Sequence, residues 1–489
     1  MIPKIDQSKW TYLVAEAAHD GLPKHVDFAG LVISHSADLN VGMAEMGARK
    51  IAVIGLCVDA HGAALREEIP LYLLVNSLDM DSLAALTDRM AGRFVILYAE
   101  GDKLFALSDA AATLHVNYAT GGRIAFSSCE QLLANVLELP ISKASEKILG
   151  GCAKTVKFLP NDLTMHEGIK FLLPNHYLAL PDRAVRFFPK GWTFAPLSPK
   201  DAAAQLAPLM RNCVSEFAKH CDLISGLTAG YDSRLVYALL REAVEKPMCY
   251  TYIQPGFNDR TPDLYIPKQL AGQFGFEYHQ MPKQKAPEAY RGSLKKLAGD
   301  WTAATHIDTA YTYAEAGWSD KSYVGGALID QIGRDHVADG RCHKFAGDDF
   351  IIAVSYNYEK TAWAHTRAWC RDANAGRGNV SLVDLFAQEV LCGRWSTTQP
   401  MVHAAAGNAY LNIFSCRDIL KLMMRVPSRR RFKRELHVAL YEIIAPELLQ
   451  IPFNPEAKLS ALKRTRFYTF LAQRLGFWLK VRKYRSKRN

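Results

Sequence analysis

The chain has 489 residues, of which 49% are hydrophobic and 22% charged, a composition typical of a soluble globular protein with two to four domains. No run of about 18 apolar residues occurs, which argues against a membrane-spanning helix, and the first residues lack the apolar core of a secretory signal. The ten cysteines are scattered singly, which argues against a zinc site and favours reduced, buried thiols. We therefore expect a cytoplasmic protein.

The net charge of +10 is concentrated at the C-terminal end. No acidic residue follows Glu456, whereas lysines and arginines alternate there with apolar residues such as Leu462, Phe467 and Trp478. This pattern is typical of a basic amphipathic helix. Docking on the body of the protein, binding of a partner and peripheral contact with an anionic membrane, on its cytoplasmic face, are all open for residues 456–489. Because the rest of the chain is close to neutral, we expect no nucleic-acid partner.

Residues 1–195 predict mainly strands and turns. Residues 51–58 and 72–76 form apolar, β-branched runs that indicate strands. Residues 93–98 and 104–107 flank Glu100-Gly101-Asp102, which is typical of a β-hairpin. A segment that contains proline and glycine marks a linker near residues 190–200.

Residues 227–233, Leu-Thr-Ala-Gly-Tyr-Asp-Ser, connect a short apolar run to a helical pattern. A loop of small residues that opens a helix lets backbone N–H groups approach a phosphate, and the helix N-terminus favours its charge. Thr228 and Ser233 add hydroxyl donors, and Asp232 adds a carboxylate that can hold a Mg²⁺ ion bridging to phosphate. The alternative is a plain strand-to-helix turn with an Asp/Ser cap.

This loop resembles the pyrophosphate loop of the asparagine synthetase-like, N-type ATP pyrophosphatases, which reads S/T-G-G-x-D-S. Ala229 replaces the first glycine, and because alanine restricts positive φ we expect a slightly altered loop. No Gly-Lys-Ser/Thr follows, so the loop is not a Walker loop. The resemblance implies that Asp232 is catalytic and binds metal, and that the pyrophosphate end of ATP is held by Leu227, Thr228, Ala229, Gly230, Tyr231 and Ser233.

The N-terminal region resembles the glutaminase-type domain of the same family. The hairpin matches that domain, and Ser108, Asp109 and Tyr118 after it match loosely. A second match lies in HEGIKFLLPNHYLAL, at Gly168, Ile169, Pro174, His176 and Tyr177. A working glutaminase of this type needs an N-terminal cysteine whose amine and thiolate act together. Here residue 2 is Ile2, and the first cysteine, Cys57, lies in a predicted strand. We expect a degenerate Ntn-type, glutaminase-like α+β domain that serves as a scaffold.

The region after residue 200 alternates predicted helices and strands. Residues 202–219 predict a helix, residues 248–253 a strand, and a further helix begins at Asp263. Helical stretches follow at 293–299 and 305–317, and then a strand that ends at Tyr323 and Val324. This order implies a parallel sheet with right-handed crossovers, and nucleotides bind at the carboxyl ends of such strands. The resemblance implies that the backbone of Tyr252 and Ile253 borders the adenine; for their side chains, a place in the sheet core is the alternative.

Gly325 and Gly326 allow a tight turn after that strand, and the family places a second acidic residue here. Asp330 is the best match, and two carboxylates at the ends of neighbouring strands can hold Mg²⁺ and its pyrophosphate. A helix cap or a surface acid is the alternative for Asp330.

Residues 345–455 predict helices and resemble the end of the synthetase domain. The basic cluster Arg429, Arg430, Arg431, Lys433 and Arg434 is either a solvated face or neutralises a leaving pyrophosphate, with Lys433 and Arg431 as the catalytic candidates. The family's R-x-K after the proline matched by Pro446 is missing, because residues 452–454 stand in its place and the next lysine is Lys458.

Together these features predict an α/β protein with a glutaminase-like domain over residues 1–195, a PP-loop ATP pyrophosphatase domain with a parallel sheet and a helical C-terminal part over 200–455, and a tail over 456–489. The resemblance implies an AMP-forming carbon–nitrogen ligase that uses ATP and Mg²⁺ to join a small-molecule or peptide carboxylate to ammonia or a substrate amine, as β-lactam synthetases and lasso-peptide cyclases do within one molecule. A nucleotide-binding pseudoenzyme and an accessory protein of a polysaccharide or natural-product pathway are the alternatives.

Overall fold

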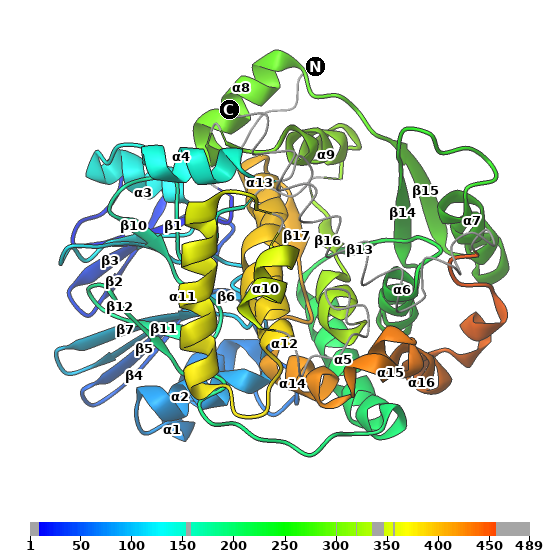
Figure 1. Ribbon diagram of the computed structural model, residues 1–489, viewed down its shortest axis with the longest axis horizontal. Helices are drawn as coiled ribbons and strands as arrows, with labels where there is room; N and C mark the ends of the chain where they lie inside the picture. Colours follow the sequence, from blue (N-terminus) through cyan, green and yellow to red (C-terminus); the bar gives the residue numbers. More distant parts are fainter. Residues whose placement is uncertain are drawn as a thin grey trace.

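The computed structural model describes residues 9–152, 158–299, 301–318, 320–334, 347–355 and 357–455. It is a mixed α/β structure with two antiparallel sheets on the left of Figure 1 and a parallel sheet on the right. The basic tail of residues 456–489 lies outside the described residues. Within the described part of the chain, no helix is long and apolar enough to cross a membrane.

The N-terminal half is built on two six-stranded antiparallel sheets. The first has the order β10-β8-β9-β1-β3-β2, and the second the order β12-β11-β7-β6-β5-β4. Their strands are β1 (Tyr12–Ala15), β2 (Lys24–Phe28), β3 (Leu31–His35), β4 (Val41–Met46), β5 (Arg49–Asp59), β6 (Met90–Glu100), β7 (Lys103–Ser108), β8 (Asn117–Ala119), β9 (Phe126–Ser127), β10 (Ile169–Phe171), β11 (His176–Ala179) and β12 (Arg183–Arg186).

The alternation of side chains along β6 explains how these sheets are stacked. Val95 and Leu97 pack into a core shared with Tyr12 of β1, whereas Phe94 and Ile96 face a separate cluster under two short helices. On the far side of the first sheet, residues of β1, β8 and β10 form a third cluster with the next helix along the chain. The result is four layers, helix–sheet–sheet–helix. The flanking elements are η1 (Arg66–Glu68), α1 (Ile69–Asn76), α2 (Met80–Leu86), η2 (Thr87–Arg89), α3 (Glu130–Leu137) and α4 (Lys143–Gly150).

The hairpin predicted around Gly101 is confirmed, because β6 and β7 pair with Glu100 opposite Lys103. Cys57 lies buried in β5, as expected of a core thiol. The predicted strand at residues 72–76 is wrong, because these residues belong to helix α1. Leu73 and Leu74 are buried under the second sheet while Leu71 and Val75 are exposed, so the run has one buried face with helical spacing.

The C-terminal half is built on a five-stranded parallel sheet with the order β15-β14-β13-β16-β17. Its strands are β13 (Leu223–Gly226), β14 (Met248–Ile253), β15 (Glu277–Pro282), β16 (Ser322–Val324) and β17 (Ala409–Leu411). The predicted alternation of strands and helices is therefore confirmed, with β15 and β17 as additional strands. The chain runs outward from β13 to β15 on one side and then to β16 and β17 on the other. Such a reversal of strand order leaves a crevice at the carboxyl end of the central strand.

Helices cover both faces of this sheet and form the rest of the C-terminal half (Figure 1). They are α5 (Pro199–His220), α6 (Tyr231–Ala243), α7 (Pro262–Phe274), α8 (Glu288–Ala298), α9 (Ala304–Glu315), the π-helix η3 (Ile329–Gly333), α10 (Asp348–Val354), α11 (Lys360–Gly376), α12 (Leu382–Phe386), the π-helix η5 (Ala387–Ser396), α13 (Thr398–Ala405), α14 (Arg417–Arg425), α15 (Ser428–Phe432), α16 (Glu435–Ile444) and η6 (Pro446–Gln450).

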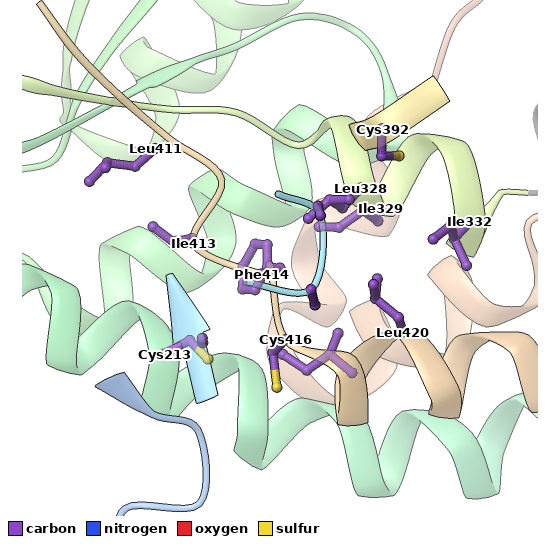
Figure 2. Packing of buried hydrophobic residues seen from close by; sticks show 14 of the residues in the cluster. Cys213, Leu328, Ile329, Ile332, Cys392, Leu411, Ile413, Phe414, Cys416 and Leu420 are labelled. Carbon is purple, nitrogen blue, oxygen red and sulfur yellow. The ribbon is translucent and has the colours of Figure 1, made fainter. Parts of the chain in front are cut away.

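A continuous apolar core joins the two halves. Figure 2 shows part of it, where Phe414 and Cys416, after β17, pack near Cys213 of α5 and Leu420 of α14. The same cluster contains Ile329 and Ile332 of η3, so apolar contacts with the core hold the short π-helix in position. Its polar side chains are therefore held in place at the edge of the parallel sheet.

A buried carboxylate also ties the halves together. Glu389 of η5 accepts hydrogen bonds from both terminal nitrogens of Arg186 in β12, at 2.5 and 3.0 Å, and from Trp369 Nε1 of α11 at 2.8 Å. Asn175 Nδ2 donates a further bond at 2.9 Å. A buried charge needs partners of this kind, so the network stabilises the contact between the antiparallel sheets and the helices.

Candidate functional site

The loop of residues 227–230 follows the carboxyl end of the central strand of the parallel sheet. It follows β13, the strand at which the strand order reverses, and Gly230 is the N-cap of α6. Leu227 N donates to Tyr250 O at 2.7 Å, and the Thr251 hydroxyl donates to Leu227 O. These bonds to β14 fix the base of the loop at the crevice where ligands bind in open α/β sheets.

The loop is organised by its own side chains. The Thr228 N–H donates to Ser233 Oγ at 3.1 Å, and the two hydroxyl oxygens are 2.9 Å apart. The Gly230 N–H donates to Thr228 Oγ1 at 3.1 Å. The first N–H groups of an α-helix have no intrahelical acceptor. The N–H groups that this geometry offers to an anion are thus those of the first turn of α6, residues 231–233.

Ala229 does not distort the loop. It is not among the residues with positive φ, so the replacement of a glycine by alanine causes no strain here. Its side chain is 1% exposed, and its N–H donates to Asp263 Oδ1 at 2.9 Å. Asp263 lies in the first turn of α7, as the sequence pattern predicts. A carboxylate oxygen therefore occupies a loop donor that a phosphate oxygen could also use.

Asp232 is bound by nitrogen-bearing side chains from two other elements. His437 Nε2 of α16 lies 2.9 Å from Asp232 Oδ1, and Arg334, directly after η3, donates from a terminal nitrogen to Asp232 Oδ2 at 3.3 Å. Burial by itself raises the pKa of Asp232, but His437, Arg334 and Arg434 outweigh burial and hold that pKa below its ordinary value. Asp232 is therefore ionised, and His437 donates the hydrogen on Nε2.

Asp330 lies on η3 beside Asp232 and shares Arg334 with it. Arg334 Nε is 2.9 Å from Asp330 Oδ1, an ion pair rather than an aligned hydrogen bond, and Gln331 Nε2 donates to Asp330 Oδ2 at 3.2 Å. The turn before η3 packs against the start of α6, since a β-carbon at Gly326 would lie in ordinary van der Waals contact with Asp232, at 3.5 Å. The structure thus brings the two predicted carboxylates together, with a guanidinium between them.

His437 and Arg434 complete the cluster from α16. Arg434 is the N-cap of α16 with φ 68°, and it donates to Phe432 O at 2.7 Å and to Arg334 O at 3.4 Å. Burial, with the charge of Arg334, lowers the pKa of Arg434 to about 10, so it stays protonated at neutral pH. The His437 side chain is fully buried, and its Nδ1 has no hydrogen-bond partner within the described part of the chain.

The two basic residues predicted to be catalytic lie in different environments. Arg431 is 1% exposed and forms a bidentate pair with Asp384 of α12, at 2.8 and 3.0 Å, and it donates to Ile332 O at 2.5 Å. Through these contacts Arg431 connects η3 to α12, which is a structural role. Lys433 is exposed. A catalytic role for either residue stays a prediction.

Tyr252 and Ile253 end β14 and are half-buried, as expected of strand-end residues beside a crevice. The Tyr252 hydroxyl donates to Thr309 O of α9 at 2.8 Å, and its ring packs against Tyr250 and Tyr313. Its side chain therefore belongs to an aromatic cluster, while its backbone stays at the strand end. Contact with adenine stays a prediction.

Residues 446–454 lie against the loop. Arg234 of α6 donates to the carbonyls of Leu448, Ile451 and Pro452, and its guanidinium stacks over the Phe453 ring at 3.6 Å. The Asn454 N–H donates to Ala229 O at 3.0 Å. The segment that replaces the family's R-x-K is thus seated on the loop itself, and Lys458 lies outside the described residues.

A separate cavity of about 360 Å³ lies between the first antiparallel sheet and helices α8, α9 and α13. Thr11, His115, Cys129 and His306 are among its lining residues, and none of the loop residues is. Burial raises the pKa of the Cys129 thiol, which donates to Leu297 O at 3.3 Å. This protonated, hydrogen-bonded thiol is not an activated nucleophile.

Neither of the residues added by the structure, Arg334 and His437, stood out as a site residue. Arg334 follows Asp330 by four positions, and its cationic type beside an expected metal ligand is the one clue that the sequence contains. His437 lies 205 positions from Asp232, in a stretch whose helical periodicity indicates only a core position.

The two carboxylates do not fit a Mg²⁺ ion as they are held. All four of their oxygens contact protein groups: His437 and Arg334 at Asp232, and Arg334 and Gln331 at Asp330. Mg²⁺ needs accessible oxygen ligands in octahedral geometry, so a guanidinium would have to leave before the ion could enter.

Comparison with known proteins does not assign a family. No protein-family model matches the chain, and no curated protein matches it. Among solved structures, the NH3-dependent NAD synthetase from Campylobacter jejuni subsp. jejuni is 18% identical over 28% of this chain and 61% of its own, with a TM-score of 0.20. The NMN synthetase from Francisella tularensis is 18% identical over 36% and 71%, with a TM-score of 0.19. The glutamine phosphoribosylpyrophosphate amidotransferase from B. subtilis is 10% identical over 60% and 87%, with a TM-score of 0.25.

The chain thus spans less than two thirds of the NAD synthetase it matches, and all three similarities are too weak to support an argument about the site.

Proposed function

We propose that the chain is an ATP-dependent, AMP-forming carbon–nitrogen ligase of the asparagine synthase-like type, in which the loop of residues 227–230 and the first turn of α6 bind the polyphosphate end of ATP. The observation that carries this proposal is the position of the loop. It links the central strand of the parallel sheet to a helix N-terminus at the point of strand reversal, beside Arg334 and Arg434. Helix N-termini at such points bind phosphate groups.

The chemistry would proceed in two steps. A substrate carboxylate oxygen attacks the α-phosphorus of ATP, the bond from that phosphorus to the bridging oxygen breaks, and pyrophosphate leaves. An amine then attacks the acyl carbon of the acyl-adenylate, AMP leaves, and the amine loses a proton. Arg334, Arg434 and the helix N-terminus would stabilise the charge that develops on pyrophosphate.

The amine and the acyl group remain open within this proposal. Because Cys57 is buried in β5 and the Cys129 thiol is protonated and donates to Leu297 O, we propose that the amine is ammonia or a substrate amine rather than ammonia released from glutamine. The acyl donor would be a small-molecule or peptide carboxylate. For the tail of residues 456–489, peripheral contact with an anionic membrane is proposed on its sequence alone.

Product analysis tests the ligase. The full chain is incubated with ATP, hydroxylamine as the amine, and pools of carboxylic acids, and nucleotides are separated by chromatography. The proposal predicts AMP and pyrophosphate in equal amounts, together with an acyl hydroxamate in the pool that contains the substrate. Production of ADP and phosphate would contradict it, because the bond cleaved would then be the wrong one.

A second candidate is a nucleotide-binding protein without catalysis. It is favoured by residues 452–454, where Phe453 and Asn454 occupy the place of the family's R-x-K, and by the internal acceptors at the loop N–H groups. Saturable ATP binding with no AMP from any pool of acids distinguishes this candidate from the ligase.

A further inference from the structure

We propose that Arg334 takes the place of a divalent cation in this site, so that the polyphosphate of a nucleotide is bound without a metal ion bridging it to Asp232 and Asp330. The inference rests on the proposed function, because that function supplies the polyphosphate ligand. It departs from the Mg²⁺-dependent site that the loop sequence implies.

The contacts of Arg334 are those of a bridging cation. Its Nε lies 2.9 Å from Asp330 Oδ1, and a terminal nitrogen lies 3.3 Å from Asp232 Oδ2. The side chains of Arg334, Asp232 and Asp330 are 20%, 14% and 25% exposed, so the group is mostly shielded from solvent. Ion pairs in such surroundings are screened less than surface pairs. A guanidinium has five N–H donors in a planar fork, so one such group can bond carboxylates and a phosphate together.

Among the described residues, two guanidinium groups face two carboxylates at this site. The guanidinium groups of Arg334 and Arg434 offset the carboxylates of Asp232 and Asp330, and all four groups interact electrostatically. An added Mg²⁺ ion would bring two further positive charges beside two guanidinium groups. A polyphosphate would instead bring negative charge to a site with two cations and a helix N-terminus.

The position of Arg334 is fixed by the elements around it. Arg434 donates to the Arg334 carbonyl. Gly333 packs against α14 and α16, since a β-carbon there would lie 3.2 Å from Met423 Sδ and 3.7 Å from His437 Cε1. Ile329 and Ile332 of η3, the element that directly precedes Arg334, are buried in the main core. The guanidinium is therefore presented by a packed element, which favours a permanent role in the site.

The test is a calorimetric titration of the full chain with ATP, once in EDTA and once in excess Mg²⁺. The proposal predicts saturable binding in EDTA, with an affinity within threefold of that in Mg²⁺. The Arg334→Gln variant should bind at least tenfold more weakly in EDTA and recover affinity in Mg²⁺, because its two carboxylates then become accessible to the ion. Arg334→Lys, which keeps the charge without the fork, should fall between the two.

Arg367→Gln is the matched control, since Arg367 lies on α11 with its side chain 45% exposed and forms an ion pair with Asp349. It should bind ATP as the natural chain does in both buffers. Circular dichroism melting of each variant establishes that it is folded before titration.

Three results would overturn the inference. Binding that is at least tenfold tighter in Mg²⁺ than in EDTA would restore the metal site and leave the proposed function intact. An Arg334→Gln variant that is folded and binds ATP in EDTA as the natural chain does would show that Arg334 is not the cation. Absence of ATP binding in both buffers would remove the proposed function and this inference together.

Discussion

Glu389 and Asp232 are both carboxylates held by an arginine and an aromatic ring nitrogen, yet their surroundings differ. Glu389 is fully buried, and Arg186, Trp369 and Asn175 supply four hydrogen bonds to its two oxygens. Asp232 is 14% exposed, and its partners Arg334 and His437 come from separate segments.

The comparison separates a structural ion pair from a site that can accept a ligand. At Glu389 the contacts join β12 and Asn175 to helices α11 and η5, and the carboxylate is fully buried. At Asp232 the guanidinium of Arg334 lies beside a helix N-terminus, and one buried atom, His437 Nδ1, has no partner among the described residues. An unpaired buried polar atom is costly, so this nitrogen is a position where a water molecule or a ligand group would be stabilising.

The largest effect is expected at the structural carboxylate. Glu389→Ala leaves Arg186 buried with Asp372 as its remaining acidic partner, so we expect a loss of about 3–5 kcal/mol in the free energy of unfolding. Urea denaturation followed by circular dichroism measures it, and ATP affinity of the folded variant should change less than twofold. Glu389→Gln, which keeps the shape and one acceptor, is the control. A loss below about 1 kcal/mol for the alanine variant would contradict the structural role.

Within the basic cluster, the buried Arg431 and the exposed Lys433 allow a structural ion pair to be compared with a surface cation. Arg431→Leu removes the guanidinium that forms a bidentate pair with the buried carboxylate of Asp384, and we expect a loss of about 3 kcal/mol in the free energy of unfolding. The double variant Arg431→Leu with Asp384→Leu should recover part of this loss, because the buried carboxylate is removed together with its guanidinium. Lys433→Ala is the control and should change stability by less than about 0.5 kcal/mol, since its side chain is exposed. Equal stability of the Arg431 and Lys433 variants would refute the assignment.

Asp263 tests whether a carboxylate at the loop opposes anion binding there. Asp263→Asn keeps an oxygen that accepts from the Ala229 N–H but removes a negative charge from the loop. We expect pyrophosphate to bind about fivefold more tightly, which corresponds to about 1 kcal/mol. Calorimetric titration with pyrophosphate measures the change, and Asp259→Asn, at an exposed position before α7, is the control. Weaker binding by the Asp263 variant would mean that the carboxylate helps to bind the anion.

The smallest effect is expected at Ala229. Because its backbone needs no positive φ, Ala229→Gly should leave ATP affinity within twofold of the natural chain while lowering the free energy of unfolding by about 0.5–1 kcal/mol. Calorimetry and urea denaturation measure the two quantities. A large gain in affinity would show that the alanine does restrict the loop.

Local sequence patterns predict much of this fold. The hairpin at Gly101 has its turn residues between two apolar strands, and the loop at Gly230 is followed by a long helical pattern. Prediction fails where the pattern is short or ambiguous. Helix α1 is uniformly apolar over residues 72–75, so its run also fits a strand, and β17 has only three residues, too few to show a period.

The candidate site is predictable only in part, for a physical reason. Asp232 and Asp330 lie next to glycines in motifs that place them at strand ends, so the sequence indicates their proximity. The contact of Asp232 with His437 depends on the packing of α16 against α6, which no local pattern encodes. The enclosure of Arg431 depends likewise on Asp384, 47 positions away, so its neighbours in the sequence indicate only a basic surface.

The central claim is that the polyphosphate end of a nucleotide binds at the N-terminus of α6. The most direct test is competition calorimetry, in which the full chain is saturated with ATP and then titrated with pyrophosphate. We predict one ATP site per chain and full displacement by pyrophosphate, while AMP alone binds much more weakly. Absence of ATP binding, or ATP binding that pyrophosphate does not displace, would contradict the claim.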